Sequence, residues 1–228
     1  MSAKAWIIFV AVCIAVLGGL VVWSKKDNVN VSAIHQNNIQ TAAASNGNIA
    51  DHVYGLPNGK VKLVEYGDFE CPYCGQAYPQ VKSLASDYSS KITFIFRNYP
   101  ISTLHPNAKA AAAAAEAAGL QGKYWEMHDK LYETQSDWQN SSIDDRTNKF
   151  ISYAQEIGVK DINKFKDDLG SSRVVKKISF DQALGNKAGV SGTPTFYLNG
   201  TKVSDKVASS VISSNGSSLR SAIDALLK

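Results

Sequence analysis

The sequence predicts an α/β domain in which a strand–helix–strand unit and a C-terminal hairpin are separated by a long helical block, with a transmembrane helix in front. Three observations carry this prediction. The apolar run 60–66 precedes a helical pattern and a second strand pattern, residues 106–187 show helical spacing almost throughout, and two short strand patterns flank Asn199-Gly200.

The first 26 residues are interpreted as a signal-anchor. Ala5–Trp23 is an uncharged stretch of 19 residues between Lys4 and Lys25, which is long enough to span a bilayer as a helix. A cleaved signal peptide is the alternative, but no clear small-x-small cleavage site precedes Ser24. One lysine before the stretch and two after it do not fix the orientation.

Residues 27–50 are rich in Asn, Ser, Gln and Ala and poor in large apolar residues, which predicts a flexible tether. The net charge of +4 is mild. It gives no indication of a nucleic-acid partner.

Residues 51–105 are predicted to form the first part of the globular domain. Residues 60–66 predict a buried strand, 76–88 a helix, and 92–96, rich in β-branched and aromatic residues, a second strand. A strand–helix–strand unit of this length favours parallel strands with a right-handed crossover.

Residues 106–187 are predicted to be a helical insertion. Ala108–Ala118 is dominated by alanine, the strongest helix former. The large apolar residues of this block are expected in its core rather than at a ligand site: Trp125, Met127 and Trp138. Residues 188–228 complete the domain with a hairpin around Asn199-Gly200 and a helix over 217–227.

Cys71-Pro72-Tyr73-Cys74 follows the first strand and opens the first helix. Unpaired N–H groups and the helix dipole favour a thiolate at that position, which indicates a redox pair with an exposed Cys71 and a shielded Cys74. Half of a zinc site and an inert disulfide are the alternatives. Zinc would need further ligands, and the only other cysteine, Cys13, lies in the membrane-type segment.

Four stretches of the sequence together resemble the DsbA-type thioredoxin-fold oxidoreductases, most strongly the membrane-anchored ones of Gram-positive and related bacteria: Glu65 to Cys74, Arg97 to Pro100, Gly122 to His128, and Val190 to Phe196. The resemblance covers roughly residues 51–228. It implies a thioredoxin fold with an inserted helical domain.

By this resemblance, Cys71 is the attacking thiol and Cys74 the resolving one, separated by the dipeptide Pro72-Tyr73. Thr193-Pro194 corresponds to the cis-proline loop that faces the disulfide. Glu65 corresponds to a buried acid that relays protons to and from Cys74, although a strand-edge carboxylate exposed to water is the alternative.

Asp68 and Glu70 are expected to be solvated loop acids. His105 and His128 are assigned no role, and no metal ligands are assigned.

The resemblance implies an enzyme that introduces disulfide bonds into reduced, unfolded exported proteins and needs no cofactor beyond the Cys71-Cys74 disulfide. A membrane reoxidase of DsbB or VKOR type is the expected second partner. We expect a monomer with a single membrane span and an extracytoplasmic catalytic domain. The alternatives are a reducing thioredoxin-like or glutaredoxin-like enzyme, an isomerase, and a non-enzymatic metal-binding or interaction module.

Overall fold

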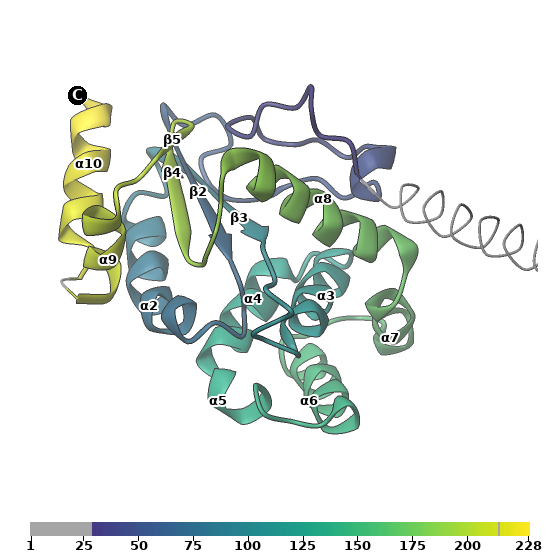
Figure 1. Ribbon diagram of the computed structural model, residues 1–228. Coiled ribbons are helices and arrows are strands. Elements are labelled where there is room, and N and C mark those ends of the chain that lie inside the picture. The colour runs from purple at the N-terminus through teal and green to yellow at the C-terminus, as the bar shows by residue number, and fades with distance from the viewer. Residues whose placement is uncertain (1–28, 214) are drawn as a thin grey trace, which may run out of the picture. The chain divides into compact units, whose positions relative to one another are not determined.

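A five-stranded sheet forms the centre of the computed structural model, which describes residues 29–213 and 215–228 (Figure 1). Residues 31–228 form one compact unit. The strand order is β1-β3-β2-β4-β5. The strands are β1 (His52–Gly55), β2 (Val61–Gly67), β3 (Ile92–Asn98), β4 (Thr195–Leu198) and β5 (Thr201–Lys202).

The central strands β2 and β3 are parallel, as predicted, whereas the other neighbouring strands are antiparallel. Every residue of β3 is buried, and so is every residue of β2 except Lys62. Strands covered on both faces need helices on both sides. Helix α2 (Pro72–Asp87) supplies the crossover between β2 and β3.

Helices cover both faces of the sheet. Figure 1 shows α2, α9 (Asp205–Ser213) and α10 (Ser217–Leu227) on one side and α8 (Ser172–Ala188) on the other. The remaining helices lie between β3 and α8 in the chain: α3 (Ala108–Gly119), α4 (Tyr124–Glu133), α5 (Gln135–Trp138), α6 (Ile143–Glu156) and α7 (Ile162–Leu169).

The predicted mixed α/β fold with a helical insertion is confirmed. The hairpin turns at Asn199 and Gly200, whose φ angles of 48° and 83° are those that an Asn-Gly hairpin turn requires. Strand β1 and helix α9 were not predicted. Both are short, and β1 lies at the edge of the sheet, where two of its residues are partly buried and two are exposed.

The predicted transmembrane span, residues 5–23, lies outside the described residues. Within residues 29–213 and 215–228, no helix is both long and apolar enough to cross a membrane.

The prediction of a flexible tether is wrong for residues 31–50, which pack against the domain. Val31 and Ile49 are buried, and a short 3-10 turn, η1, covers Ala44–Asn46. Two basic side chains of the domain hold the segment by its backbone. The Arg97 guanidinium donates to the carbonyls of Gln36 and Asn38, and the Lys187 ammonium donates to those of Val31, Ser32 and Ile34. The prediction of flexibility is based on the polar side chains of this segment. It does not take into account the backbone carbonyls, which Arg97 and Lys187 bind.

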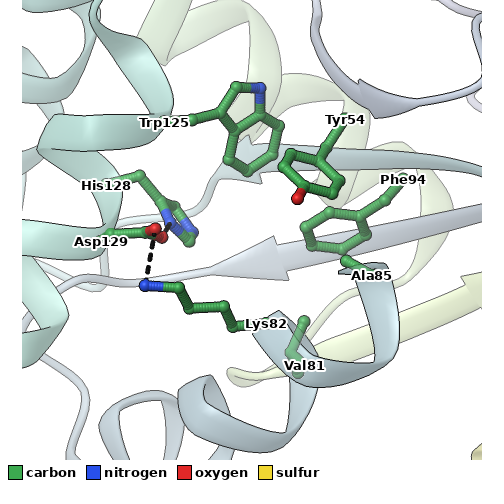
Figure 2. A pocket seen from close by; sticks show the side chains of 8 residues that line it. All are labelled: Tyr54, Val81, Lys82, Ala85, Phe94, Trp125, His128 and Asp129. Carbon is green, nitrogen blue, oxygen red and sulfur yellow. Dashed lines mark hydrogen bonds and ion pairs between the residues drawn. The ribbon is translucent and has the colours of Figure 1, made fainter. Parts of the chain in front are cut away.

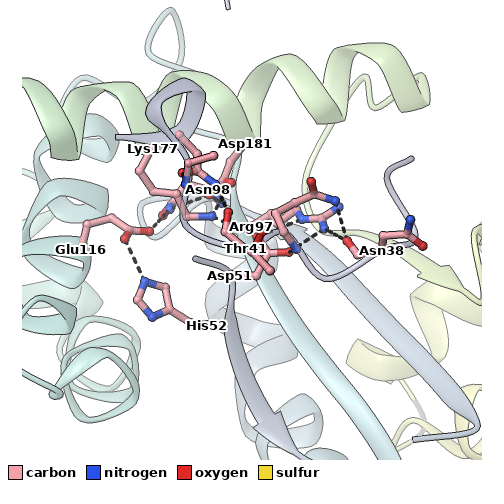
Figure 3. A network of polar contacts seen from close by, with 12 residues as sticks. Asn38, Thr41, Asp51, His52, Arg97, Asn98, Glu116, Lys177 and Asp181 are labelled. Atoms are coloured by element: carbon pink, nitrogen blue, oxygen red, sulfur yellow. Dashed lines mark hydrogen bonds and ion pairs between the residues drawn. The ribbon is translucent and has the colours of Figure 1, made fainter. Parts of the chain in front are cut away.

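A network of fully buried charges joins this segment to β3 and α8 (Figure 3). Asp51 accepts from Arg97 Nη2 at 2.7 Å and from Lys177 Nζ at 3.0 Å, and Lys177 also lies 2.7 Å from Asp181. Burial opposes the ionisation of Asp51, but Lys177 and Arg97 outweigh it and hold its pKa at about 2. Asp51 therefore stays ionised inside the protein, whereas burial raises the pKa of Asp181 to about 6 in spite of the neighbouring Lys177.

Replacing Lys177 by Met should strongly destabilise the fold, because it leaves Asp51 and Asp181 buried beside too little positive charge. We expect the free energy of unfolding to fall by about 3–5 kcal/mol in urea denaturation. Lys164→Met is the matched control, since Lys164 forms an i,i+4 pair with Asp168 but is 49% exposed, and it should cost under about 1 kcal/mol. Equal losses in the two variants would contradict this account of the network.

Candidate redox site

The two cysteines lie where β2 gives way to α2. Cys71 is the N-cap residue of α2 and Pro72 is its first residue. The Cys71 N–H donates to the Asp68 carbonyl at 3.1 Å, and the Cys71 carbonyl accepts from Gly75 N at 3.0 Å. The Cys71 sulfur therefore lies at the positive end of the helix dipole.

Both sulfurs are free thiols in this structure, and both residues are buried. Cys71 is 4% exposed and Cys74 is 1% exposed. The expectation of an exposed Cys71 is therefore wrong; its sulfur contacts the carbonyl of Thr193, which is distant in the sequence. The exposed part of the motif is the dipeptide between the thiols, in which Tyr73 is 60% exposed.

Thr193-Pro194 brings a distant loop to the redox pair. Its peptide bond is cis, as expected, and the Cys71 thiol donates to the Thr193 carbonyl at 3.3 Å. The Thr193 hydroxyl oxygen is buried without a hydrogen-bond partner. Once Cys71 loses its proton, that hydroxyl can donate to the thiolate.

The two thiols differ in acidity. A hydrogen bond from Cys74 is the main influence on Cys71; burial opposes it, but Thr193 and the backbone N–H groups of Tyr73 and Cys74 add to it and lower the Cys71 pKa to about 6. Burial raises the pKa of Cys74 well above its ordinary value, and the Cys71 charge adds to this. At neutral pH the reduced pair is therefore a Cys71 thiolate and a Cys74 thiol.

Glu65 lies in the middle of the sheet, where β2 pairs with β3 and β4. It is 4% exposed, so the alternative of a solvated carboxylate is wrong. Burial, with a contribution from the Cys71 charge, raises its pKa to about 8. Glu65 is therefore mostly a neutral acid at pH 7 and can release a proton.

Asp68 and Glu70 are buried, so the expectation of solvated loop acids is wrong. Asp68 accepts from the backbone N–H groups of Glu70 and Ile101, at 2.9 and 2.8 Å, and bonds to His105 Nδ1 at 2.8 Å. Glu70 accepts from Asn107 N at 2.6 Å, just before α3. The two acids fix the loop after β3 against the residues that precede Cys71.

Gln135, from the helical insertion, also holds the active-site loop. Its Nε2 donates to the carbonyls of Phe69 and Cys71 at 2.7 and 3.0 Å. Gly75 leaves room for it, because a Cβ there would collide with the Gln135 side chain. Sequence analysis missed this residue, because a glutamine 64 positions after Cys71 carries no local signal.

A separate cavity of about 50 Å³ lies between α2, α4 and the sheet (Figure 2). Trp125 and Phe94 contribute aromatic walls, and Lys82 pairs with Asp129 at the rim. The buried His128 lines it, and burial lowers its pKa. Neither cysteine lines this cavity. Met127 and Trp138 are fully buried, as expected, whereas Trp125 is only partly buried.

The zinc alternative for the Cys-x-x-Cys pair has no further ligands in the described part of the chain. No group of three or more His, Cys, Asp or Glu side chains there is arranged to hold a metal ion.

Comparison with known proteins places this geometry in a family. A segment of the Na(+)/H(+) antiporter NhaA 1 of Salinispora arenicola is 41% identical over 152 residues, covering 67% of this chain but only 22% of the antiporter. The chain thus spans less than a quarter of this curated relative.

Two solved structures share the fold. A thioredoxin-like oxidoreductase from Silicibacter pomeroyi is 29% identical, with a TM-score of 0.56 over 72% of this chain and 90% of that one. The thiol-disulfide exchange protein alpha-DsbA2 from Wolbachia pipientis is 23% identical, with a TM-score of 0.61 over 77% and 87%. The resemblance to DsbA-type proteins is confirmed in the fold. Since the family model described as Thioredoxin matches residues 47–215, the chain belongs to the thioredoxin family.

Proposed function

We propose that this protein is a thiol:disulfide oxidoreductase that introduces disulfide bonds into reduced, unfolded exported proteins. The observation that carries the proposal is the difference between its two thiols. Cys71 has a pKa of about 6, whereas burial raises the pKa of Cys74 well above its ordinary value. A dithiol stabilised as a thiolate makes the corresponding disulfide an oxidant.

The reaction starts from the Cys71-Cys74 disulfide. A client thiolate attacks Cys71 Sγ, a client–Cys71 bond forms, and the Cys71-Cys74 bond breaks with its electron pair on Cys74. A second client thiolate then attacks the client sulfur of this mixed disulfide and releases Cys71 as a thiolate. The client loses two electrons, and the enzyme ends as a dithiol.

Glu65 is the proton donor for the first step. Cys74 leaves as a thiolate in a buried site, and its high pKa makes it a strong base. A neutral carboxyl group with a pKa of about 8 gives up a proton to such a base readily. The carboxylate that remains recovers its proton from solvent.

Thr193 and Pro194 have a positioning role in this scheme. The Thr193 carbonyl lies 3.3 Å from the Cys71 sulfur. An extended client segment can bond to the backbone beside Pro194 in the manner of an added strand. The client cysteine would then lie at Cys71.

The reduced enzyme needs a second partner. A membrane reoxidase of DsbB or VKOR type would restore the Cys71-Cys74 disulfide, and an anchor at residues 5–23 would keep the catalytic domain beside it, outside the cytoplasm. A monomer is sufficient for this chemistry, because one chain supplies every residue of the site.

Cys74→Ala should accumulate a mixed disulfide between Cys71 and a client protein that has a single thiol, because neither Cys74 nor a second client thiol can attack that bond. The variant is first loaded as a Cys71–glutathione disulfide; the client thiolate attacks Cys71 Sγ, and glutathione leaves as a thiolate. Separating the products without reductant would reveal the adduct as a band of the summed mass. Wild type should give almost none. The proposal would be contradicted if the variant formed no adduct with the client that a reductant cleaves.

A reducing, glutaredoxin-like enzyme is the second candidate, because Pro72-Tyr73 is also the glutaredoxin dipeptide. An enzyme that donates disulfides and one that reduces them differ in the reduction potential of the Cys71-Cys74 pair.

A further inference from the structure

An open groove of about 690 Å³ begins beside the redox pair, on the side of the helical insertion. Its lining includes Glu70 and Pro72, the two neighbours of Cys71, and continues over residues 104–107 and 139–143. Thr193 and Pro194 are not among the described residues that line it. The groove is therefore distinct from the cis-proline loop, and it begins at Pro72, the residue next to Cys71.

Two large apolar side chains project from the walls of this groove. Leu104 is 70% exposed and Ile143 is 68% exposed, and the neighbouring Tyr73 is 60% exposed. A single exposed apolar residue needs no explanation, but several beside a reactive group mark an interaction surface. They can cover an apolar side chain that enters the groove.

The groove also contains an uncompensated cation. The Arg146 guanidinium donates to the Asn107 side chain, and no carboxylate of the described residues lies within ion-pair distance of it. Glu70 also lines the groove, but its carboxylate accepts from Asn107 N and forms no ion pair with Arg146. His105 bonds to the buried Asp68. Arg146 therefore favours an acidic side chain on a bound chain.

We propose that this groove binds the extended segment next to a client cysteine, and that it selects segments with an apolar residue beside the cysteine and an acidic residue further along. The inference deepens the proposed function and rests on it. Exchange requires the client sulfur at Cys71, and each further client residue extends about 3.3 Å from there. The flanking residues thus reach the groove that starts at Pro72.

The test compares oxidation of four short dithiol peptides by the full chain in its disulfide form. The peptides differ only in carrying Leu or Ser beside the cysteine and Asp or Lys beyond it. We expect the Leu/Asp peptide to have the highest kcat/KM. The double variant Leu104→Ser with Ile143→Ser should lower that value about tenfold and leave the Ser peptides nearly unchanged.

Two variants complete the design. Arg146→Gln should reduce the preference for Asp over Lys by up to about fivefold. Val175→Ser is the matched control, because Val175 is a 53% exposed apolar residue of α8 that does not line the groove. Oxidation of dithiothreitol, which is too small to occupy the groove, should be the same in every variant.

The outcomes separate this inference from the proposed function. Unchanged peptide selectivity in the groove variants, with dithiothreitol still oxidised, would overturn the groove and leave the function standing. No oxidation of dithiothreitol by wild type would overturn the function. The groove can then be tested alone by measuring, through fluorescence anisotropy, the affinity of a Leu/Asp peptide that has serines in place of its cysteines. Loss of affinity in the double variant supports the proposed groove. Unchanged affinity rejects the groove.

Discussion

Cys71→Ser should abolish disulfide transfer to a reduced, unfolded protein. A serine hydroxyl cannot form a disulfide, so no disulfide exists for a client thiolate to attack. The remaining Cys74 thiol is 1% exposed and has a raised pKa, so it offers no thiolate in its place. The measurement is the loss of client thiols over time after oxidised enzyme is added, and the variant should match the rate without enzyme.

Loss of activity in Cys71→Ser is informative only if the variant folds as the wild type does. Serine is close to cysteine in size and is a favourable N-cap residue, so α2 should form normally. Circular dichroism and the unfolding midpoint of the reduced proteins provide the control. Full activity in a folded Cys71→Ser variant would show that Cys71 is not the attacking thiol.

Glu65→Gln should stabilise the protein in a pH-dependent manner. Folding raises the pKa of Glu65 from 4.5 to about 8, so between these values the unfolded chain loses a proton that the folded protein keeps. The wild type therefore loses stability as pH rises through this range. The variant has no such group, so its advantage should grow from near zero at pH 4.5 to roughly 4 kcal/mol at pH 8.

The same substitution should slow disulfide transfer, because glutamine has no acidic proton to give to Cys74. Wild-type activity should fall as pH rises above about 8, where Glu65 is ionised, and the difference between the two proteins should shrink there. Urea denaturation of the reduced proteins across this pH range gives the stability, and client oxidation gives the rate. Glu126→Gln is the control, because Glu126 is 46% exposed. This variant should change neither the pH dependence of stability nor that of client oxidation. A constant stability difference at every pH would contradict the raised pKa.

Much of the fold could be predicted because its signals are local. The strand pattern at 60–66, the alanine-rich helix and the Asn-Gly turn each fix their element through nearby residues. The two cysteines could be placed at a helix N-terminus for the same reason. Thr193-Pro194 could be assigned only through the family resemblance, since the tripeptide Gly-Thr-Pro by itself resembles an ordinary turn.

The missed features depend on contacts between distant parts of the chain. Gln135 reaches the Cys71 carbonyl from the helical insertion, and Arg97 binds carbonyls about 60 positions earlier. Asp68 is acidic and lies in a loop, so composition favours solvation. Its burial follows from backbone N–H donors that only the folded chain brings to it.

The most direct test of the central claim is the equilibrium between the Cys71-Cys74 pair and glutathione at pH 7. A Cys71 thiolate with a pKa of about 6 stabilises the reduced pair. We therefore expect a potential nearer about −120 mV, the value of strongly oxidising pairs, than about −270 mV, the value of thioredoxin. A potential close to −270 mV would contradict an enzyme that donates disulfides and would favour a reductase instead.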